Sequence, residues 1–127
     1  LLINEACHKH GVPWIYNGVI MSYGTSMNIL QGENGPCFRC LYSGASAPDS
    51  QASCASMGVL NMITGVIGSV ASAEALKILT GSPEVRRTLF LIDVWMNVAR
   101  YEQIGKNPAC PVCGGGRYAI LDGHGHR

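Results

Sequence analysis

The sequence predicts an α/β fold in which a mixed sheet packs against one long buried helix. Three observations lead to this prediction. Residues 1–10 have a helical pattern, and a short loop connects them to an apolar run at residues 12–20, which is the usual helix-to-strand step of an α/β sheet. Residues 88–104 contain a second pair of strand-like segments. Between these parts, residues 57–79 carry apolar side chains at intervals of three and four, the period of a helix.

The first helix is predicted over residues 1–10, with Gly11 ending it. Its apolar stripe, interpreted as the face toward the core, consists of Leu2, Ile3, Ala6 and Cys7. Because His8 and His10 are two residues apart, they point to different sides of a helix. We interpret them as solvated side chains of the last turn, where cations suit the helix dipole, and not as metal ligands.

The strands follow from apolar runs between turn residues. Residues 12–20 and 25–30 are predicted as antiparallel neighbours, with a bend at residues 23–24, and residues 88–94 and 98–104 as a hairpin. A short edge strand is predicted at residues 118–121. Residues 122–127 are predicted to be a disordered tail, in which His124 and His126 are interpreted as solvated.

The long helix, residues 57–79, is predicted to be buried between the sheet and a second element. Its remaining faces carry small residues, which let another backbone approach closely. These residues are Gly58, Gly65, Gly68, Ala71 and Ala75. A membrane span is the rival interpretation. Polar and charged residues interrupt and close the apolar run, and no aromatic belt flanks it, so the sequence favours a soluble helix.

Two Cys-x-x-Cys motifs, which we call the knuckles, lie about 70 residues apart. They are Cys37-Phe-Arg-Cys40 and Cys110-Pro-Val-Cys113. Each knuckle presents two sulfurs from one tight turn, so the pair fits one tetrahedral zinc ion bound by four thiolates. Such a site has no open position for substrate, and we interpret the zinc as structural. Two redox-active dithiols or disulfides are the alternative that this spacing also permits.

Composition narrows the function classes. The 127 residues fit one domain, with 47% hydrophobic and only 13% charged residues, which suggests a surface that a partner or a missing segment covers. The net charge of +1 without a basic run argues against a nucleic-acid-binding protein. The sequence shows no signal peptide, and four of its six cysteines lie in the knuckles, so we expect a cytoplasmic protein. Because it begins without methionine in what reads as mid-helix, we expect a fragment of something longer.

A polar stretch at residues 41–56 has too little apolar content to pack and is predicted to be a flexible loop. It contains one thiol outside the knuckles, Cys54. We interpret Cys54 as lying just before the N-terminus of the long helix, whose dipole favours a thiolate. An inconsequential surface cysteine is the alternative.

The order of these motifs resembles the C-terminal half of the ThiF/MoeB/HesA family, which are E1-like enzymes related to ubiquitin-activating enzymes. The resemblance is carried by the opening Leu2-Ile3-Asn4-Glu5-Ala6-Cys7, by Val12-Pro13-Trp14, by the first knuckle, by the run from Gly65 to Lys77 and by Cys110-Pro-Val-Cys113-Gly114-Gly115. It covers nearly the whole chain. It implies a Rossmann-like fold of which residues 1–127 are the C-terminal part, without the nucleotide-binding half.

The resemblance implies an enzyme that uses ATP and Mg²⁺ to adenylate the C-terminal glycine of a ubiquitin-like sulfur-carrier protein, of the molybdopterin or thiamine type. It also implies a homodimer and a crossover loop, here residues 41–56, in which Cys54 occupies the position of the cysteine that accepts the acyl group or sulfur in some members. The phosphate-binding loop lies upstream in the family, and no G-x-G-x-x-G follows a strand here. We therefore expect this chain alone to be inactive in adenylation.

Two other functions remain open at this stage. One is a zinc-stabilised binding module that docks the extended tail of a partner along a sheet edge without catalysis. The other is a dithiol oxidoreductase, which a zinc content near one per chain, lost only on chelation, would exclude.

Overall fold

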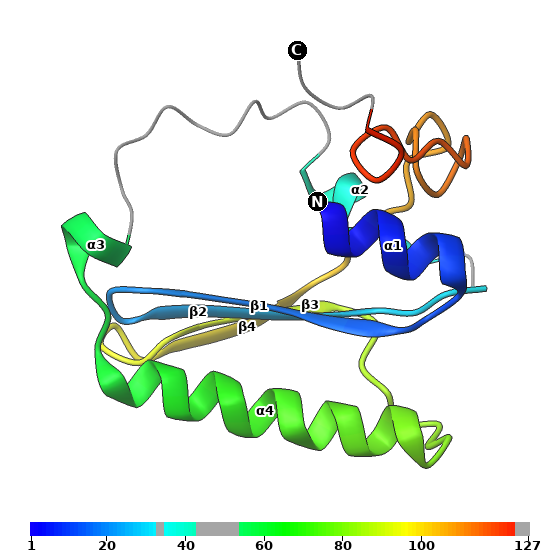
Figure 1. The fold of residues 1–127 in the computed structure, drawn as a ribbon. Helices are drawn as coiled ribbons and strands as arrows, with labels where there is room; N and C mark the ends of the chain where they lie inside the picture. Colours follow the sequence, from blue (N-terminus) through cyan, green and yellow to red (C-terminus); the bar gives the residue numbers. More distant parts are fainter. Residues whose placement is uncertain (33–34, 43–53, 124–127) are drawn as a thin grey trace. The chain divides into compact units, whose positions relative to one another are not determined.

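A computed structural model describes residues 1–32, 35–42 and 54–123 (Figure 1). Its elements are, in order, α1 (Leu2–His10), β1 (Trp14–Ile20), β2 (Tyr23–Ile29), α2 (Phe38–Leu41), α3 (Cys54–Met57), α4 (Asn61–Leu79), β3 (Leu89–Asp93) and β4 (Val98–Glu102). The chain divides into two compact units. We call them the cysteine unit (Leu1–Trp14, Ile29–Gly44 and Ile104–Arg127) and the sheet unit (Ile15–Asn28 and Ala45–Gln103).

The four strands form one sheet in the order β1-β2-β3-β4. β2 pairs antiparallel with β3, with Tyr23 opposite Asp93, and β3 pairs antiparallel with β4, with Asp93 opposite Val98. The prediction of a mixed sheet is therefore wrong. Among the described residues, the one parallel pairing is an isolated bridge between Met21 and Val59. Tight turns account for the antiparallel direction of β1 and β2 and of β3 and β4, whereas β2 and β3 pair antiparallel across the long connection that contains α4.

Of the two tight turns of the sheet, the one between β1 and β2 differs in detail from the sequence prediction. The β1–β2 turn lies at Met21 and Ser22 and not at residues 23–24, with Met21 at a φ of 52°. The backbone of Met21 also fixes the entry to α4, since its N–H donates to the carbonyl of Gly58 and its carbonyl accepts from the N–H of Leu60 (2.9 and 2.8 Å). The β3–β4 hairpin forms where the sequence predicted it.

Helix α4 runs along one face of the sheet (Figure 1). The core of the sheet unit is a cluster of Ile63, Ile67 and Phe90, with valines and Ile92 packed around it. Gly24 on β2 permits this contact, because a Cβ at that position would lie 2.5 Å from Cγ1 of Ile67. The absence of a side chain on the strand thus lets the helix approach closely.

The prediction that the long helix is buried between the sheet and a second element is wrong for the described chain. Leu76 and Leu79 are 64% and 84% exposed, and Met62 on the same helix is 59% exposed. The helix also begins at Asn61, four residues later than predicted. A core position requires something packed on each face, and the contacts of α4 bury only the face toward the sheet.

By length and composition alone, α4 would pass as a membrane span, with a mean hydropathy of 1.5. A core helix passes the same test, so the finding is weak evidence. Glu74, on this helix, is 3% exposed. Its carboxylate accepts hydrogen bonds from Lys77 Nζ (2.7 Å), Asn28 Nδ2 (2.5 Å) and the backbone N–H of Arg86 (2.9 Å). The buried face of α4 is therefore partly polar and ion-paired within the protein.

Both well-formed helices end as the sequence predicted. Gly11 after α1 and Gly81 after α4 each have a φ of 66°. In each case the residue that follows donates its N–H back to the last turn, Val12 to the carbonyl of Cys7 and Ser82 to that of Lys77 (both 2.9 Å). This left-handed C-terminal cap favours glycine because it has no Cβ.

The buried face of α1 is the opposite of the one predicted. Leu2 and Ile3 are 52% and 61% exposed, whereas Asn4 and Glu5 are 1% and 5% exposed. Polar partners from distant segments, rather than apolar packing, cover this face. The predicted core residue Cys7 is half-buried.

The edge strand predicted at residues 118–121 is also wrong, because this segment forms turns. The N–H of Asp122 donates to the carbonyl of Tyr118 (2.8 Å). The N–H groups of Ile120 and Leu121 donate to Oε2 of Glu5 (2.9 and 2.8 Å). These donors are satisfied by a carboxylate, so the segment does not need the neighbouring strand that an edge strand requires.

Candidate metal centre

The first knuckle sits at the start of the short helix α2. Cys37 is its N-cap residue, with φ −89° and ψ 173°, and Cys40 lies in its last turn. The N–H of Cys40 donates to the carbonyl of Cys37 (3.0 Å), which closes the turn. Both side chains are buried, at 2% and 8% exposure. The turn thereby directs two sulfurs to the same side of the backbone.

The second knuckle is built by consecutive turns of the C-terminal segment. The N–H of Cys110 donates to the carbonyl of Asn107, and the carbonyl of Cys110 accepts from Gly114 and Gly115 (2.9 to 3.0 Å). At Gly114 a Cβ would lie 2.3 Å from the carbonyl oxygen of Pro108. Only glycine fits this close backbone approach.

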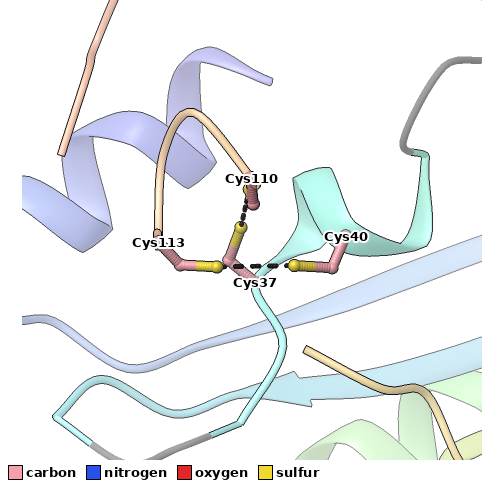
Figure 2. A group of neighbouring side chains, drawn as sticks. All are labelled: Cys37, Cys40, Cys110 and Cys113. Carbon is pink, nitrogen blue, oxygen red and sulfur yellow. Dashed lines mark hydrogen bonds between the residues drawn. The ribbon is translucent and has the colours of Figure 1, made fainter. Parts of the chain in front are cut away.

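The two knuckles meet within the cysteine unit, as Figure 2 shows. The sulfurs of Cys37 and Cys110 are 3.7 Å apart, and those of Cys40 and Cys113 are 3.4 Å apart. All four sulfurs lie within 4.8 Å of one another, so the cluster could hold a metal ion. The residues predicted as metal ligands are therefore brought together, although 73 positions separate the paired cysteines.

The sulfur spacing suits a tetrahedral metal. Four thiolates at about 2.3 Å from one ion lie about 3.8 Å from each other. The shortest cross-knuckle separations of 3.7 and 3.4 Å approach that spacing. A disulfide requires about 2.05 Å between its sulfurs, and the four cysteines are free thiols here.

The electrostatics of the cluster oppose four thiolates without a cation. Burial raises the pKa of Cys37 and also that of Cys113, next to the sulfur of Cys40. Burial also acts on Cys110, but the backbone N–H groups of Cys113 and Val112 outweigh it and lower the pKa of Cys110 to about 7. A divalent cation would remove the penalty by pairing with all four sulfurs.

Hydrogen bonds to sulfur come from outside the knuckles as well. Nδ2 of Asn4 donates to Sγ of Cys37 (3.7 Å), and the backbone N–H of Asn107 donates to Sγ of Cys40 (3.5 Å). From the sequence, Asn4 was part of the opening run that resembles the family, and no role was predicted for it. In the sequence, Asn4 and Glu5 are two adjacent polar residues in the helix that precedes the first knuckle. This pattern fits a solvated helix face equally well, so it does not predict a contact with the cysteines.

Cys54 was predicted as a reactive thiol in a loop over residues 41–56. Residues 43–53 of that loop lie outside the described residues, and Leu41 belongs to α2. Cys54 is the first residue of the four-residue helix α3, and not the residue just before the long helix, which begins at Asn61. Seven positions therefore separate Cys54 from the start of α4, whereas the effect of a helix dipole is confined to the first turn.

The histidines among the described residues are not part of the cysteine cluster. Nδ1 of His8 lies 3.0 Å from the hydroxyl of Tyr118, and His10 is exposed. His124 and His126 lie outside the described residues. Within the described chain, the four cysteines are the group found close enough to bind one ion.

An apolar hollow of about 510 Å³ lies in the sheet unit, beside the start of α4. It is lined by Met21, Ser22, Met57, Gly58, Val59, Leu60 and Trp95. Trp95 is 72% exposed and its neighbour Met96 is 66% exposed. Large exposed apolar side chains around a hollow are typical of a docking surface.

With this fold and this cysteine cluster established, comparison with known proteins assigns the class. The chain matches the model of the ThiF family over residues 1–112, and it belongs to that family. A sulfur carrier protein adenylyltransferase of Thermus thermophilus is 36% identical over 119 residues, covering 89% of this chain and 44% of the relative. The SAMP-activating enzyme E1 of Haloferax volcanii is 33% identical, covering 91% of this chain and 42% of the relative.

A third relative, the sulfur carrier protein ThiS adenylyltransferase of Bacillus subtilis, is 31% identical, with 90% of this chain and 33% of the relative covered. The chain thus spans less than half the length of these relatives. Among solved structures, MccB of E. coli matches with a TM-score of 0.70 over 88% of this chain and 34% of that one, at 18% identity. This likeness supports the fold.

Proposed function

We propose that the four-cysteine cluster holds a structural zinc ion. The observation that carries the proposal is the convergence of four buried or half-buried sulfurs within 4.8 Å. Thiolates are soft ligands that suit zinc, and two Cys-x-x-Cys turns are the usual source of a closed tetrathiolate site. The bound ion would supply a cross-link between segments far apart in sequence, and Cys37, Cys40, Cys110 and Cys113 would be its ligands.

The zinc proposal is tested by elemental analysis of protein purified under reducing conditions without added chelator. We expect close to one zinc per chain, lost only when a strong chelator is added. Iron in place of zinc, or disulfides with no metal, would contradict the proposal and favour a cluster-binding or dithiol protein instead.

We infer that the chain forms part of an enzyme that uses ATP and Mg²⁺ to adenylate the C-terminal glycine of a ubiquitin-like sulfur-carrier protein. The family match and the printed names of the relatives support this inference. In the reaction, an oxygen of the glycine carboxylate attacks the α-phosphorus of ATP, an acyl-adenylate forms and pyrophosphate leaves. This chain would contribute the zinc-stabilised part and one wall of the carrier site.

A later step would use Cys54. Its thiolate would attack the acyl carbon of the adenylate, form a thioester and release AMP, with the thiol proton passing to solvent. The Cys54→Ser substitution in the longer protein distinguishes a reactive thiol from an inconsequential one. Loss of the carrier thioester with normal ATP–pyrophosphate exchange would support this role, whereas unchanged transfer would exclude it.

The adenylation proposal is tested by ATP–pyrophosphate exchange driven by a carrier protein. We expect exchange by a longer protein that includes a family-type nucleotide-binding half, and none by residues 1–127 alone, because no G-x-G-x-x-G motif follows a strand in this sequence. Robust exchange by residues 1–127 would overturn this division of roles.

A second candidate function is a binding module without catalysis, and the apolar hollow beside Trp95 favours it. A carrier protein would be recognised through this surface. Titration of a carrier protein should quench or shift the fluorescence of Trp95, and Trp95→Ala should weaken binding. Trp14 is the second tryptophan of the chain and is half-buried, so the Trp14→Phe variant isolates the signal of Trp95.

We further propose a cytoplasmic homodimer. The exposed apolar face of α4, with Leu76 and Leu79, supports association with another protein surface. Light scattering of the purified longer protein tests the oligomeric state, and a monomer at micromolar concentration would contradict it.

A further inference from the structure

Asn4 is almost completely buried, at 1% exposure, and both ends of its side-chain amide are occupied. Oδ1 accepts a hydrogen bond from the backbone N–H of Phe38 (3.0 Å). Nδ2 donates to the sulfur of Cys37 (3.7 Å). Asn4 therefore spans from α1 to two consecutive residues of the first knuckle.

The orientation of this amide is determined by chemistry. A backbone N–H only donates, so the atom of Asn4 that faces Phe38 must be the oxygen. The nitrogen then necessarily faces Cys37. The hydrogen bond to sulfur consequently follows from the contact with Phe38.

We propose that Asn4 is a positioning residue of the metal centre, which donates an N–H···S hydrogen bond to a metal-bound Cys37 thiolate. The proposal rests on the zinc site proposed above. Four thiolates and one zinc ion carry a net negative charge, and this cluster is largely buried. A donor directed at one sulfur withdraws electron density from it and fixes the direction of the ligand, as outer groups do in other metal sites.

The neighbouring residue Glu5 gives α1 a second attachment. Glu5 is 5% exposed. Its carboxylate accepts hydrogen bonds from the N–H groups of Ile120 and Leu121, a few residues after the second knuckle. Two adjacent residues of one helix thus hold the segments that carry the two knuckles. This arrangement explains why polar residues occupy the buried face of α1, since each of them satisfies donors or acceptors of the metal-binding segments.

Asn4→Asp is the informative substitution. A carboxylate keeps an acceptor for the N–H of Phe38 but removes the donor and places negative charge beside the sulfur of Cys37. We expect zinc affinity, measured by competition with a chelator, to fall by about 10- to 100-fold. In the cobalt-substituted protein, the sulfur-to-cobalt charge-transfer band should move to lower energy, because the sulfur becomes more electron-rich.

Asn107→Asp is the matched control. Asn107 also lies beside the metal centre, but it reaches Cys40 through its backbone N–H, which the substitution retains. Its Oδ1 accepts from the N–H of Ala109 (2.9 Å), which a carboxylate can also do. The control therefore adds the same charge nearby without removing a donor to sulfur. We expect zinc affinity and the cobalt spectrum to stay close to those of the unsubstituted protein.

Asn4→Leu removes both hydrogen bonds without adding charge, and it carries the test if the aspartate variant does not fold. It should also weaken zinc binding and shift the cobalt band. Equal loss in Asn4→Asp and Asn107→Asp would overturn the proposal, because the effect would then be one of charge alone. So would unchanged affinity in Asn4→Asp with loss in Asn4→Leu, because Asn4 would then act only through Phe38. If the unsubstituted protein binds no zinc, the metal proposal itself fails.

Discussion

Different kinds of interaction stabilise the interiors of the two compact units of this chain. In the sheet unit, Ile63 and Ile67 of α4 pack on Phe90 of the sheet, and apolar side chains surround them. In the cysteine unit the buried side chains are mainly three cysteines and the polar pair Asn4 and Glu5, with only a few apolar residues such as Val112. Small units with so little apolar burial usually need a metal or cross-links for their stability, so we expect the cysteine unit to depend on the zinc ion proposed above.

Because the two units depend on different interactions, we expect a single substitution to destabilise one unit and leave the other folded. Hydrogen exchange measured segment by segment reports on the two units separately, with α1 and residues 104–123 for the cysteine unit and α4 with β3 for the sheet unit.

The largest expected effect is that of Cys110→Ser. Zinc binding to small metal-dependent units contributes about 10–16 kcal/mol to their folding, and removal of one ligand forfeits most of it. Zinc content should fall from near one per chain to near zero, and protection should disappear in α1 and residues 104–123. Cys7→Ser, which changes a half-buried cysteine outside the cluster, is the control and should retain zinc. Intact protection of the cysteine unit in Cys110→Ser would refute its dependence on metal.

Next in size is Gly114→Ala. The new Cβ would lie 2.3 Å from the carbonyl oxygen of Pro108 and 2.8 Å from that of Cys110. Backbone atoms of a tight turn cannot move aside, so we expect a loss of about 3 kcal/mol or more from the zinc-bound cysteine unit. Chemical denaturation with zinc present measures it. Gly105→Ala, in the same segment but with open space around it, should be nearly neutral, and equal effects would argue against a steric cause.

Gly24→Ala should act on the sheet unit and cost less, about 1–3 kcal/mol. Here the new Cβ meets the side chain of Ile67, with Cγ1 at 2.5 Å and Cδ1 at 2.8 Å, and a side chain can shift. Ile67→Ala removes both Cγ1 and Cδ1, so the loss in the double variant should be smaller than the sum of the two single losses. As a control, Gly65→Ala on the exposed side of α4 should stabilise the helix by about 0.5–1 kcal/mol. Additive losses in the double variant would count against the predicted contact.

The smallest effect concerns pH. Although burial acts in the opposite direction, hydrogen bonds from Lys77, the amide of Arg86 and Asn28 lower the pKa of Glu74 below 4.5 in the folded protein. A lowered pKa stabilises the fold above the unfolded value of about 4.5, and this stabilisation disappears as pH falls through the folded value. Urea unfolding followed in the sheet unit should therefore show a decline below about pH 4.5.

The Glu74→Gln variant tests this assignment, since glutamine does not titrate. It should be less stable than the unsubstituted protein at neutral pH and should show a flatter pH dependence. Measurements on chelator-treated protein remove the separate loss of zinc in acid. The same slope in both proteins would mean that another carboxylate is responsible.

Local sequence patterns were sufficient for most elements of the fold. The glycine after α1 and the glycine after α4 mark helix ends that the structure reproduces, and the hairpin of β3 and β4 forms where apolar runs flank a short turn. These features depend on neighbouring residues. The convergence of the four cysteines could also be predicted from their spacing, because each knuckle is a local turn that presents two sulfurs, and two such turns fit around one ion.

The sequence alone was sufficient to predict that the four cysteines converge, where the long helices and the four strands of the sheet lie to within a few residues, and that the chain resembles the ThiF family. Only the tertiary structure decided that the sheet is antiparallel, that α4 is covered on one face, and that Asn4 and Glu5 lie inside. The reason is physical: Asn4 meets Cys37 33 positions away, and Glu5 meets Ile120 115 positions away. A polar residue is buried only when such distant partners satisfy it, and no local pattern encodes where those partners will be.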